Sequence, residues 1–398
     1  MVDKATGGKY LAEVFPNHAN PLVTAPAETT ILAILLAESP LSRVELARRT
    51  GLSSTAVTKA ARPLIDGGYL HELPPERTAP GAGRPVNPLA VTPDREFFVG
   101  VWIGADSLHG AVCDLRARVR ATAERPLDRL DPAPVVAQLA ELVDELLDSA
   151  GEFRERTRQL GIVVAGWANR DTGQVSHQLL PGWEDVALAE PVAAATGLTV
   201  TVENDVKALT VAEHWFGEGI GTEYFALVTL GARVASGLVV NGELVTGAYG
   251  AAGELGHVRV DPDGPACRCG SNGCVEAIAS TDAILAAVRE AAGDPELDLE
   301  GAVRLARDGD PGAREAFVRA GRAVGTGIAT LVTLFGPERV VIAAESSDTL
   351  DLLDGPIREA YAELCFKAAA RCPLSLRPLP PEEWARGGAV IGIQALFP

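Results

Sequence analysis

The sequence predicts a winged helix-turn-helix over residues 1–90, followed by an α/β domain of two lobes. Two observations predict this organisation. Short helical segments separated by a tight turn come before a stretch rich in Pro and Gly at residues 73–93. From residue 95 onward, apolar strands alternate with helices in two successive stretches, which is typical of α/β folds. We therefore expect a first lobe over 95–215 and a second lobe over 216–398, with the last helix returning to the first lobe.

The first two predicted helices lie between residues 28 and 50. Residues 28–37 carry apolar side chains that recur on one helical face. Ser42 and Glu45 match a capping box, in which the hydroxyl and the carboxylate satisfy free backbone donors at a helix start. A short second helix should therefore run from there to about Thr50.

The third predicted helix begins at Ser53, which caps it, and runs toward a glycine pair that ends it. Pro63 lies inside this helix, where it removes a backbone donor. We therefore expect a kink or an early end near Arg62. Two short extended pieces, 69–71 and 89–91, flank the stretch rich in Pro and Gly and predict a β-wing.

The formal net charge of -18 is unfavourable for binding to nucleic acid, because phosphates are contacted by Lys and Arg. The charge is unevenly distributed, however. Between Ser42 and Pro63 the one acidic residue is Glu45. The same segment carries the basic residues Arg43, Arg48, Arg49, Lys59 and Arg62.

A helix with small and polar outward side chains fits the DNA major groove. Arg84 in the wing, between two small neighbours, is expected to enter a minor groove. The alternative is a small helical domain that binds another protein. The expected DNA contacts are Arg43, Ser53, Ser54, Thr55, Thr58, Lys59, Arg62 and Arg84.

The length of 398 residues, 47% hydrophobic and 22% charged, is enough for two or three folded domains. No stretch approaches the roughly 18 apolar residues of a membrane span, and Met1–Tyr10 lacks the apolar core of a secretion signal. We therefore expect a cytoplasmic protein without a membrane partner.

The segment GELGHVRVDPDGPACRCGSNGCVE contains the strongest chemical signal. One imidazole and three thiolates lie close together in sequence, which is a ligand set typical of tetrahedral Zn²⁺. Incidental cysteines in a loop are the alternative, but they do not explain four ligands in so short a span. The predicted structural zinc ligands are His257, Cys267, Cys269 and Cys274.

Together with this segment, several motifs resemble the ROK family, named for repressors, unassigned reading frames and kinases. The resemblance implies a two-lobed actin- or sugar-kinase-like (RNase H-like) fold after the winged helix, which is an extension carried by the repressor branch. The matching motifs are VENDVKAL at 202–209, LPGWEDV at 180–186, NGELVTGAYGAAGELGH at 241–257, SRVELARRTGLSSTAVTK at 42–59 and Gly83-Arg84-Pro85.

The resemblance also implies a sugar pocket. In kinases of this family the matching polar residues bind sugar hydroxyls, and the carboxylate at Asp205 is the general base. Solvated loop contacts are the alternative for each of them. Leu179 stands where kinase-like members often carry Asn, so one sugar contact is expected to be missing. The implied sugar-binding residues are Asn204, Asp205, Glu254, His257 and Glu276.

The nucleotide motifs depart from the family pattern. The first phosphate motif of the family reads Asp-Ile-Gly-Gly-Thr. Trp102 stands in place of its Asp, and Asp106 stands in place of its Thr. The second motif, normally rich in Gly, is Gly231-Ala232-Arg233-Val234-Ala235-Ser236-Gly237, and the adenosine motif is Ala343-Ala344. Phosphoryl transfer depends on positioning of the triphosphate, so we expect no kinase activity, and Asp205 is at most a vestigial base.

The resemblance therefore favours a DNA-binding transcriptional repressor or regulator of sugar metabolism genes, whose effector is a sugar or sugar phosphate. A sugar kinase with a fused DNA-binding domain is the alternative. A DNA-binding protein with a vestigial pocket is a third hypothesis. Because winged helices usually read two half-sites of an operator, we expect a homodimer or homotetramer.

Overall fold

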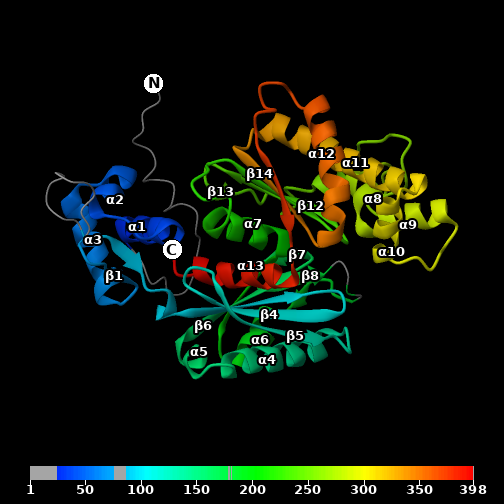
Figure 1. Ribbon diagram of the computed structural model, residues 1–398. Helices are drawn as coiled ribbons and strands as arrows, with labels where there is room; N and C mark the ends of the chain where they lie inside the picture. The colour runs from blue at the N-terminus through cyan, green and yellow to red at the C-terminus, as the bar shows by residue number, and fades with distance from the viewer. Residues whose placement is uncertain (1–24, 76–86, 178–179, 181, 398) are drawn as a thin grey trace. The chain divides into compact units, whose positions relative to one another are not determined.

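The protein divides into two compact units, each with its own sheet and core. Unit 1 comprises Met1–Ile220 with Trp384–Pro398, and unit 2 comprises Gly221–Glu383. Among the described residues, no helix has the length and apolar character needed to cross a bilayer. The computed structural model (Figure 1) describes residues 25–75, 87–177, 180 and 182–397.

The N-terminal part of unit 1 is a three-helix winged motif. Its helices bury one apolar face each, with Leu35, Leu46 and Val57 fully buried. Two short strands pair antiparallel after the helices, with Leu70 opposite Val91. The elements are α1 (Pro26–Glu38), α2 (Arg43–Thr50), α3 (Ser54–Asp66), β1 (Leu70–Glu72) and β2 (Leu89–Val91).

The predicted helix starts are confirmed by their caps. The Ser42 hydroxyl accepts a hydrogen bond from the Glu45 N–H at 3.1 Å, and Ser53 Oγ accepts one from the Ala56 N–H at 3.2 Å. An early end near Arg62 is wrong, because α3 continues to Asp66 with Pro63 inside it. The buried apolar face and the carbonyl of Pro63, which accepts the N–H of Gly67 at 2.8 Å, support the last turn.

The rest of unit 1 is built on a five-stranded mixed sheet with the order β10-β6-β3-β4-β5. β3, β4 and β5 are antiparallel neighbours, whereas β6 and β10 lie parallel to β3. The strands are β3 (Phe97–Ile103), β4 (Ser107–Asp114), β5 (Val119–Pro126), β6 (Thr157–Val164) and β10 (Thr199–Asn204). A small sheet adds β7 (Gly166–Asn169), β8 (Gln174–His177) and β9 (Val186–Ala187).

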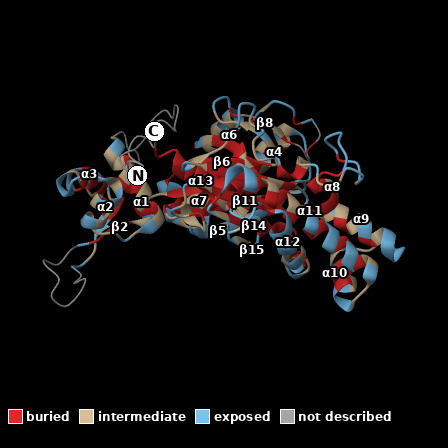
Figure 2. Cartoon of the chain, turned by 90° about the horizontal axis from the view of Figure 1, so that it is seen from above, coloured by how far each residue is buried: buried red, intermediate tan, exposed pale blue. Residues whose placement is uncertain are grey.

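Helices cover both faces of this sheet (Figure 1), and its central strand β3 is buried along nearly its whole length (Figure 2). On one face, α4 and α6 close a core with β3 and β6. On the other, α13 approaches the strands so closely that a Cβ on Gly100 would lie 1.8 Å from the Ala385 carbonyl oxygen, so only glycine fits there. The helices are α4 (Pro132–Asp148), α5 (Gly151–Arg156), α6 (Ala189–Thr196), α7 (Asp205–Phe216) and α13 (Pro381–Gln394).

Unit 2 has a second five-stranded sheet, with the order β13-β12-β11-β14-β15. β11 and β14 lie parallel, with Leu230 opposite Ala344, so their carboxyl ends meet. The strands are β11 (Phe225–Leu230), β12 (Val234–Val240), β13 (Glu243–Leu244), β14 (Arg339–Ala344) and β15 (Leu374–Pro378).

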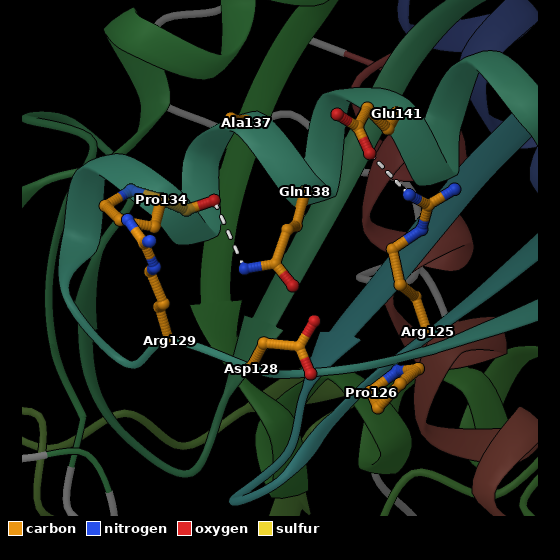
Figure 3. Close-up of a pocket in the computed structure, with 8 residues that line it drawn as sticks. All are labelled: Arg125, Pro126, Asp128, Arg129, Pro134, Ala137, Gln138 and Glu141. Carbon is orange, nitrogen blue, oxygen red and sulfur yellow. Dashed lines mark hydrogen bonds and ion pairs between the residues drawn. The ribbon is translucent and has the colours of Figure 1, made fainter.

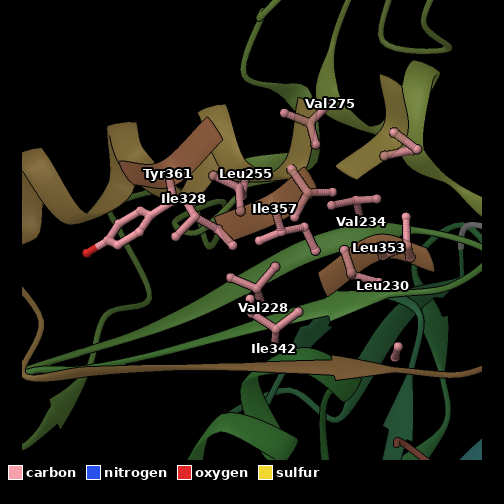
Figure 4. Close-up of a cluster of buried hydrophobic side chains, with 14 of the residues drawn as sticks. Val228, Leu230, Val234, Leu255, Val275, Ile328, Ile342, Leu353, Ile357 and Tyr361 are labelled. Carbon is pink, nitrogen blue, oxygen red and sulfur yellow. The ribbon is translucent and has the colours of Figure 1, made fainter. Parts of the chain in front are cut away.

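The core of unit 2 lies between this sheet and its helices (Figure 4). Val228 and Ile342 extend from the strands toward Ile328 and Ile357 of the helices. The helices are α8 (Val275–Ala279), α9 (Thr281–Ala292), α10 (Leu299–Asp308), α11 (Pro311–Phe335) and α12 (Leu350–Leu364).

Candidate functional site

Helix α3 presents a polar face to solvent. Its apolar residues Val57 and Leu64 are buried in the winged motif, which leaves the opposite side of the helix free. Ser53 is already used as the cap of the helix. The predicted contacts Ser53, Ser54, Thr55, Thr58, Lys59 and Arg62 are all exposed.

The predicted basic residues differ in how far they are engaged within the chain. Arg43 forms an ion pair with Glu72 of β1 at 2.5 Å, so it joins α2 to the wing. Arg62 lies 3.5 Å from Asp66 and is largely exposed. Arg84 and the neighbouring glycine and proline lie outside the described residues.

The predicted zinc ligands converge in unit 2. The ligand atoms of His257, Cys267, Cys269 and Cys274 all lie within 4.8 Å of one another. Cys269 Sγ lies 3.7 Å from Cys274 Sγ, and Cys267 Sγ lies 3.5 Å from His257 Nδ1. Tetrahedral zinc with bonds of about 2.3 Å to sulfur separates two sulfurs by about 3.8 Å. The donor set therefore fits a zinc ion held by four protein ligands.

The buried thiol of Cys274 needs a cation beside it to act as a metal ligand. Burial, followed by hydrogen bonds from the neighbouring thiols, raises the pKa of Cys274. A thiol in such a place becomes a thiolate at neutral pH only when a positive charge lies beside it. Four protein ligands leave no open coordination position, which is typical of a structural zinc site.

Asn204 and Asp205 lie at the start of α7 in unit 1. The Asn204 side chain caps this helix, since its Oδ1 accepts the Lys207 N–H at 3.0 Å and its Nδ2 donates to the Gly166 carbonyl at 2.8 Å. Asp205 is buried, and its Oδ1 accepts the Val206 N–H at 2.8 Å. Both side chains are therefore held in fixed positions.

Glu254 and His257 lie together in unit 2, where Glu254 directly precedes a single helical turn that ends at His257. Glu254 Oε2 is 3.9 Å from His257 Nε2, while Nδ1 of the same ring faces Cys267. The two nitrogens of His257 therefore separate the two predicted roles, with Nδ1 toward the metal cluster and Nε2 toward Glu254. A ligating imidazole is commonly oriented by a partner on its other nitrogen.

Glu276, the last predicted sugar-binding residue, is enclosed by cations. Arg268 Nε lies 2.6 Å from Glu276 Oε1, Arg233 Nη1 lies 3.4 Å from the same oxygen, and the Val234 N–H donates to Oε2 at 3.2 Å. Burial raises the pKa of Glu276, but these contacts outweigh it and the pKa lies below its usual range. The sequence motifs contain no signal for this pair of arginines.

The position of the first phosphate motif is filled by aromatic rings. Trp102 stacks on His109, with centroids 5.3 Å apart, and on Trp384 at 5.7 Å. Trp384 is buried at the start of the part of α13 that belongs to unit 1. This stack has no carboxylate at the place where the family pattern uses one to order a metal ion.

The second phosphate motif contains a contact that sequence reasoning missed. The Glu345 carboxylate, which directly follows Ala343-Ala344, accepts the Ala232 N–H at 2.9 Å. The two residues are 113 positions apart, and the parallel pairing of β11 with β14 brings them together.

A pocket in unit 1 lies between the end of β5 and α4, away from every predicted site residue (Figure 3). Its polar groups partly satisfy one another, because Arg125 pairs with Glu141 and Gln138 donates to the Pro134 carbonyl at 3.4 Å. It gives no independent argument for a ligand.

Fold and site together define a protein that joins a winged helix-turn-helix to a sugar-kinase-like α/β domain. Residues 28–71 match the model described as winged helix-turn-helix DNA-binding, and residues 98–398 match the model described as ROK family. The chain therefore belongs to the ROK family, as the motifs indicated.

Relatives of this chain include both regulators and kinases. It is 28% identical to the DNA-binding transcriptional dual regulator NagC of Escherichia coli, over 83% of this chain and 82% of NagC. It is 36% identical to a glucokinase of Thermotoga maritima, over 58% of this chain and 75% of that enzyme.

A solved ROK family transcriptional regulator, described as a homologue of the E. coli Mlc protein, superimposes with a TM-score of 0.76 at 29% identity. The match covers 93% of this chain and 97% of that one. These comparisons support a sugar-related transcriptional regulator.

Proposed function

We propose that this protein is a sequence-specific DNA-binding regulator of sugar metabolism genes whose effector is a sugar or a sugar phosphate. The observation that carries the proposal is the exposed polar and basic face of α3, in a winged motif on the same chain as a ROK domain. A helix of this kind reads base edges in the major groove, while basic side chains contact phosphates.

The effector contacts are proposed at Asn204, Asp205, Glu254 and His257. An amide, two carboxylates and an imidazole are the groups that accept from and donate to neighbouring sugar hydroxyls. Their support is the match to the family's sugar motifs and the fixed positions of Asn204 and Asp205. Glu276 belongs to the same proposal, with the difference that Arg233 and Arg268 already contact it.

Zinc is proposed to fix the loop that carries this chemistry. With His257 Nδ1 on the metal, Nε2 stays free to face Glu254 and a sugar hydroxyl. Zinc would supply rigidity here, because a closed four-ligand site contributes folding free energy and no catalytic position.

The protein is proposed to have no kinase activity. Two features oppose a triphosphate at the places where the family's motifs bind it. One is the aromatic stack at Trp102, and the other is the Glu345 carboxylate that accepts the Ala232 N–H. The alternative, an ATP-dependent sugar kinase, is favoured by the retained Asp205 and by the identity to a glucokinase. A base alone does not supply the positioning and charge stabilisation that phosphoryl transfer needs.

The experiment that tests the proposal starts from sheared genomic DNA of the source organism. The purified full chain is used to select fragments, which are sequenced and then titrated by fluorescence anisotropy with hexoses, amino sugars and hexose phosphates. We expect enrichment of a paired half-site motif, since the chain is proposed to act as a homodimer or homotetramer. Recovery of fragments without a shared motif would contradict the proposal.

A further inference from the structure

Residues 231–234, which are the turn between β11 and β12 with the first residue of β12, lie at the carboxyl end of β11. β14 ends beside it, because the two strands run parallel with Leu230 opposite Ala344. In α/β sheets, ligands bind at the carboxyl ends of parallel strands, and backbone N–H groups of tight turns make sites for anions. The turn therefore lies at a place where α/β sheets commonly bind phosphate.

Glu345 is attached to this turn through its backbone and its side chain. Its N–H donates to the Leu230 carbonyl at 2.8 Å, and its carboxylate accepts the Ala232 N–H at 2.9 Å. A Cβ built on Gly231 would lie 1.8 Å from Glu345 Oε2. The carboxylate thus lies directly on the Gly231 backbone, in space that a side chain at 231 would fill.

The other backbone donors described in this turn also have partners within the chain. The Val234 N–H donates to Glu276 at 3.2 Å, and the Gly231 N–H donates to the Arg233 carbonyl at 3.1 Å. Two of these three donors therefore bind carboxylates of the protein itself. An incoming phosphate would have to displace a tethered carboxylate from Ala232 and would be repelled by its charge.

We propose that residues 231–234 form an oxyanion-binding turn whose ligand is the chain's own Glu345 carboxylate, and that removal of this carboxylate opens the turn to a phosphate group. The inference deepens the proposed absence of kinase activity and rests on it. According to this inference, the Glu345 carboxylate occupies the phosphate turn of unit 2 and thereby opposes kinase activity. A single substitution of Glu345 should empty the turn.

The test compares wild-type protein with E345G and E345Q in the full chain, using inorganic phosphate as the probe. Calorimetric titrations are run at pH 8 and at constant ionic strength, with chloride as the balancing anion. Glu338 provides the matched control, since its Oε1 accepts the backbone N–H groups of Glu223 and Tyr224 at 2.7 and 3.1 Å. It precedes β14, so E338Q changes charge equally at the other end of the strand.

We expect phosphate to bind E345G at least about ten-fold more tightly than it binds wild type. This difference in affinity is about what one hydrogen bond to a charged group contributes. E345Q, which keeps the volume and loses the charge, should bind with intermediate affinity, and E338Q should match wild type. If E345G does not fold, E345Q carries the test.

Equal phosphate affinity in folded E345G, E345Q and wild type would overturn the inference, and so would an equal gain in E338Q. Neither result affects the proposed regulator. The proposed absence of kinase activity is contradicted separately, by sugar phosphorylation by the wild-type chain.

Discussion

Cys269 Sγ lies 3.7 Å from Cys274 Sγ, although one thiol is exposed and the other is fully buried. Thiols of such different environments are brought to this separation by the turns at Gly270 and Gly273, both with positive φ. A Cβ on Gly273 would lie 1.5 Å from the Asp261 carbonyl oxygen. The loop is therefore shaped around the cluster.

Zinc content is the first prediction. Metal analysis of purified wild-type protein should find about one zinc per chain, and C269S should lose most of it, because an incomplete tetrahedral set loses most of its affinity. C372S is the control, since Cys372 is not part of the cluster. Wild-type protein without zinc, or C269S with full occupancy, would contradict the assignment.

Lys59 provides the second prediction. It is exposed on α3, and K59A should weaken DNA binding and lower the slope of log affinity against log salt by about 1 if it neutralises one phosphate. K367A removes an exposed charge in unit 2 and should leave the slope unchanged. Identical salt slopes for K59A and wild type would exclude this phosphate contact.

Glu254 provides the third prediction. Its side chain is 53% exposed, so E254Q should fold normally and bind the effector sugar about 10- to 100-fold more weakly, the range of one hydrogen bond to a charged group. Asn204 is a poorer probe, because N204A also removes the cap of α7, which costs about 1 kcal/mol. E290Q changes an exposed carboxylate on α9 and serves as the control. An unchanged sugar affinity in E254Q would remove Glu254 from the pocket.

The fourth prediction concerns pH. Desolvation raises the pKa of Glu345, and the hydrogen bond from Ala232 only partly opposes it. A carboxyl group with a raised folded pKa stabilises the fold below its ordinary pKa, and this stabilisation is lost as pH rises through the folded pKa. Wild type should therefore gain stability relative to E345Q as pH falls from 7 to 5. Denaturant titrations measure the difference in the free energy of unfolding between wild type and E345Q. A difference that stays constant with pH, or that shifts in favour of E345Q as pH falls, would contradict the prediction.

Local signals in the sequence were sufficient for the winged motif and for the convergence of one histidine and three cysteines. The caps at Ser42 and Ser53 act within three residues, and the four residues of the His/Cys cluster fall within a span of eighteen positions. Of the two outcomes expected at Pro63, a kink or an early end, the early end was wrong, because the buried face of α3 outweighs the cost of the missing N–H.

Contacts in the site between residues far apart in the sequence were not predictable from local patterns. The loss of glycines from the second phosphate motif was visible in the sequence. The contact of Glu345 with this motif was not, because it depends on the pairing of β11 with β14. The pairing of Arg233 with Glu276 likewise joins residues 43 positions apart.

The most direct test of the central claim is a titration of selected genomic DNA with the full chain, with and without the sugar that binds. The account predicts salt-dependent binding to a specific site and a change in DNA affinity of at least about five-fold with the sugar, the lower range of allosteric coupling. No ADP should be released from ATP under the same conditions. Failure to bind any site, together with sugar-dependent ADP release that D205A abolishes, would contradict it.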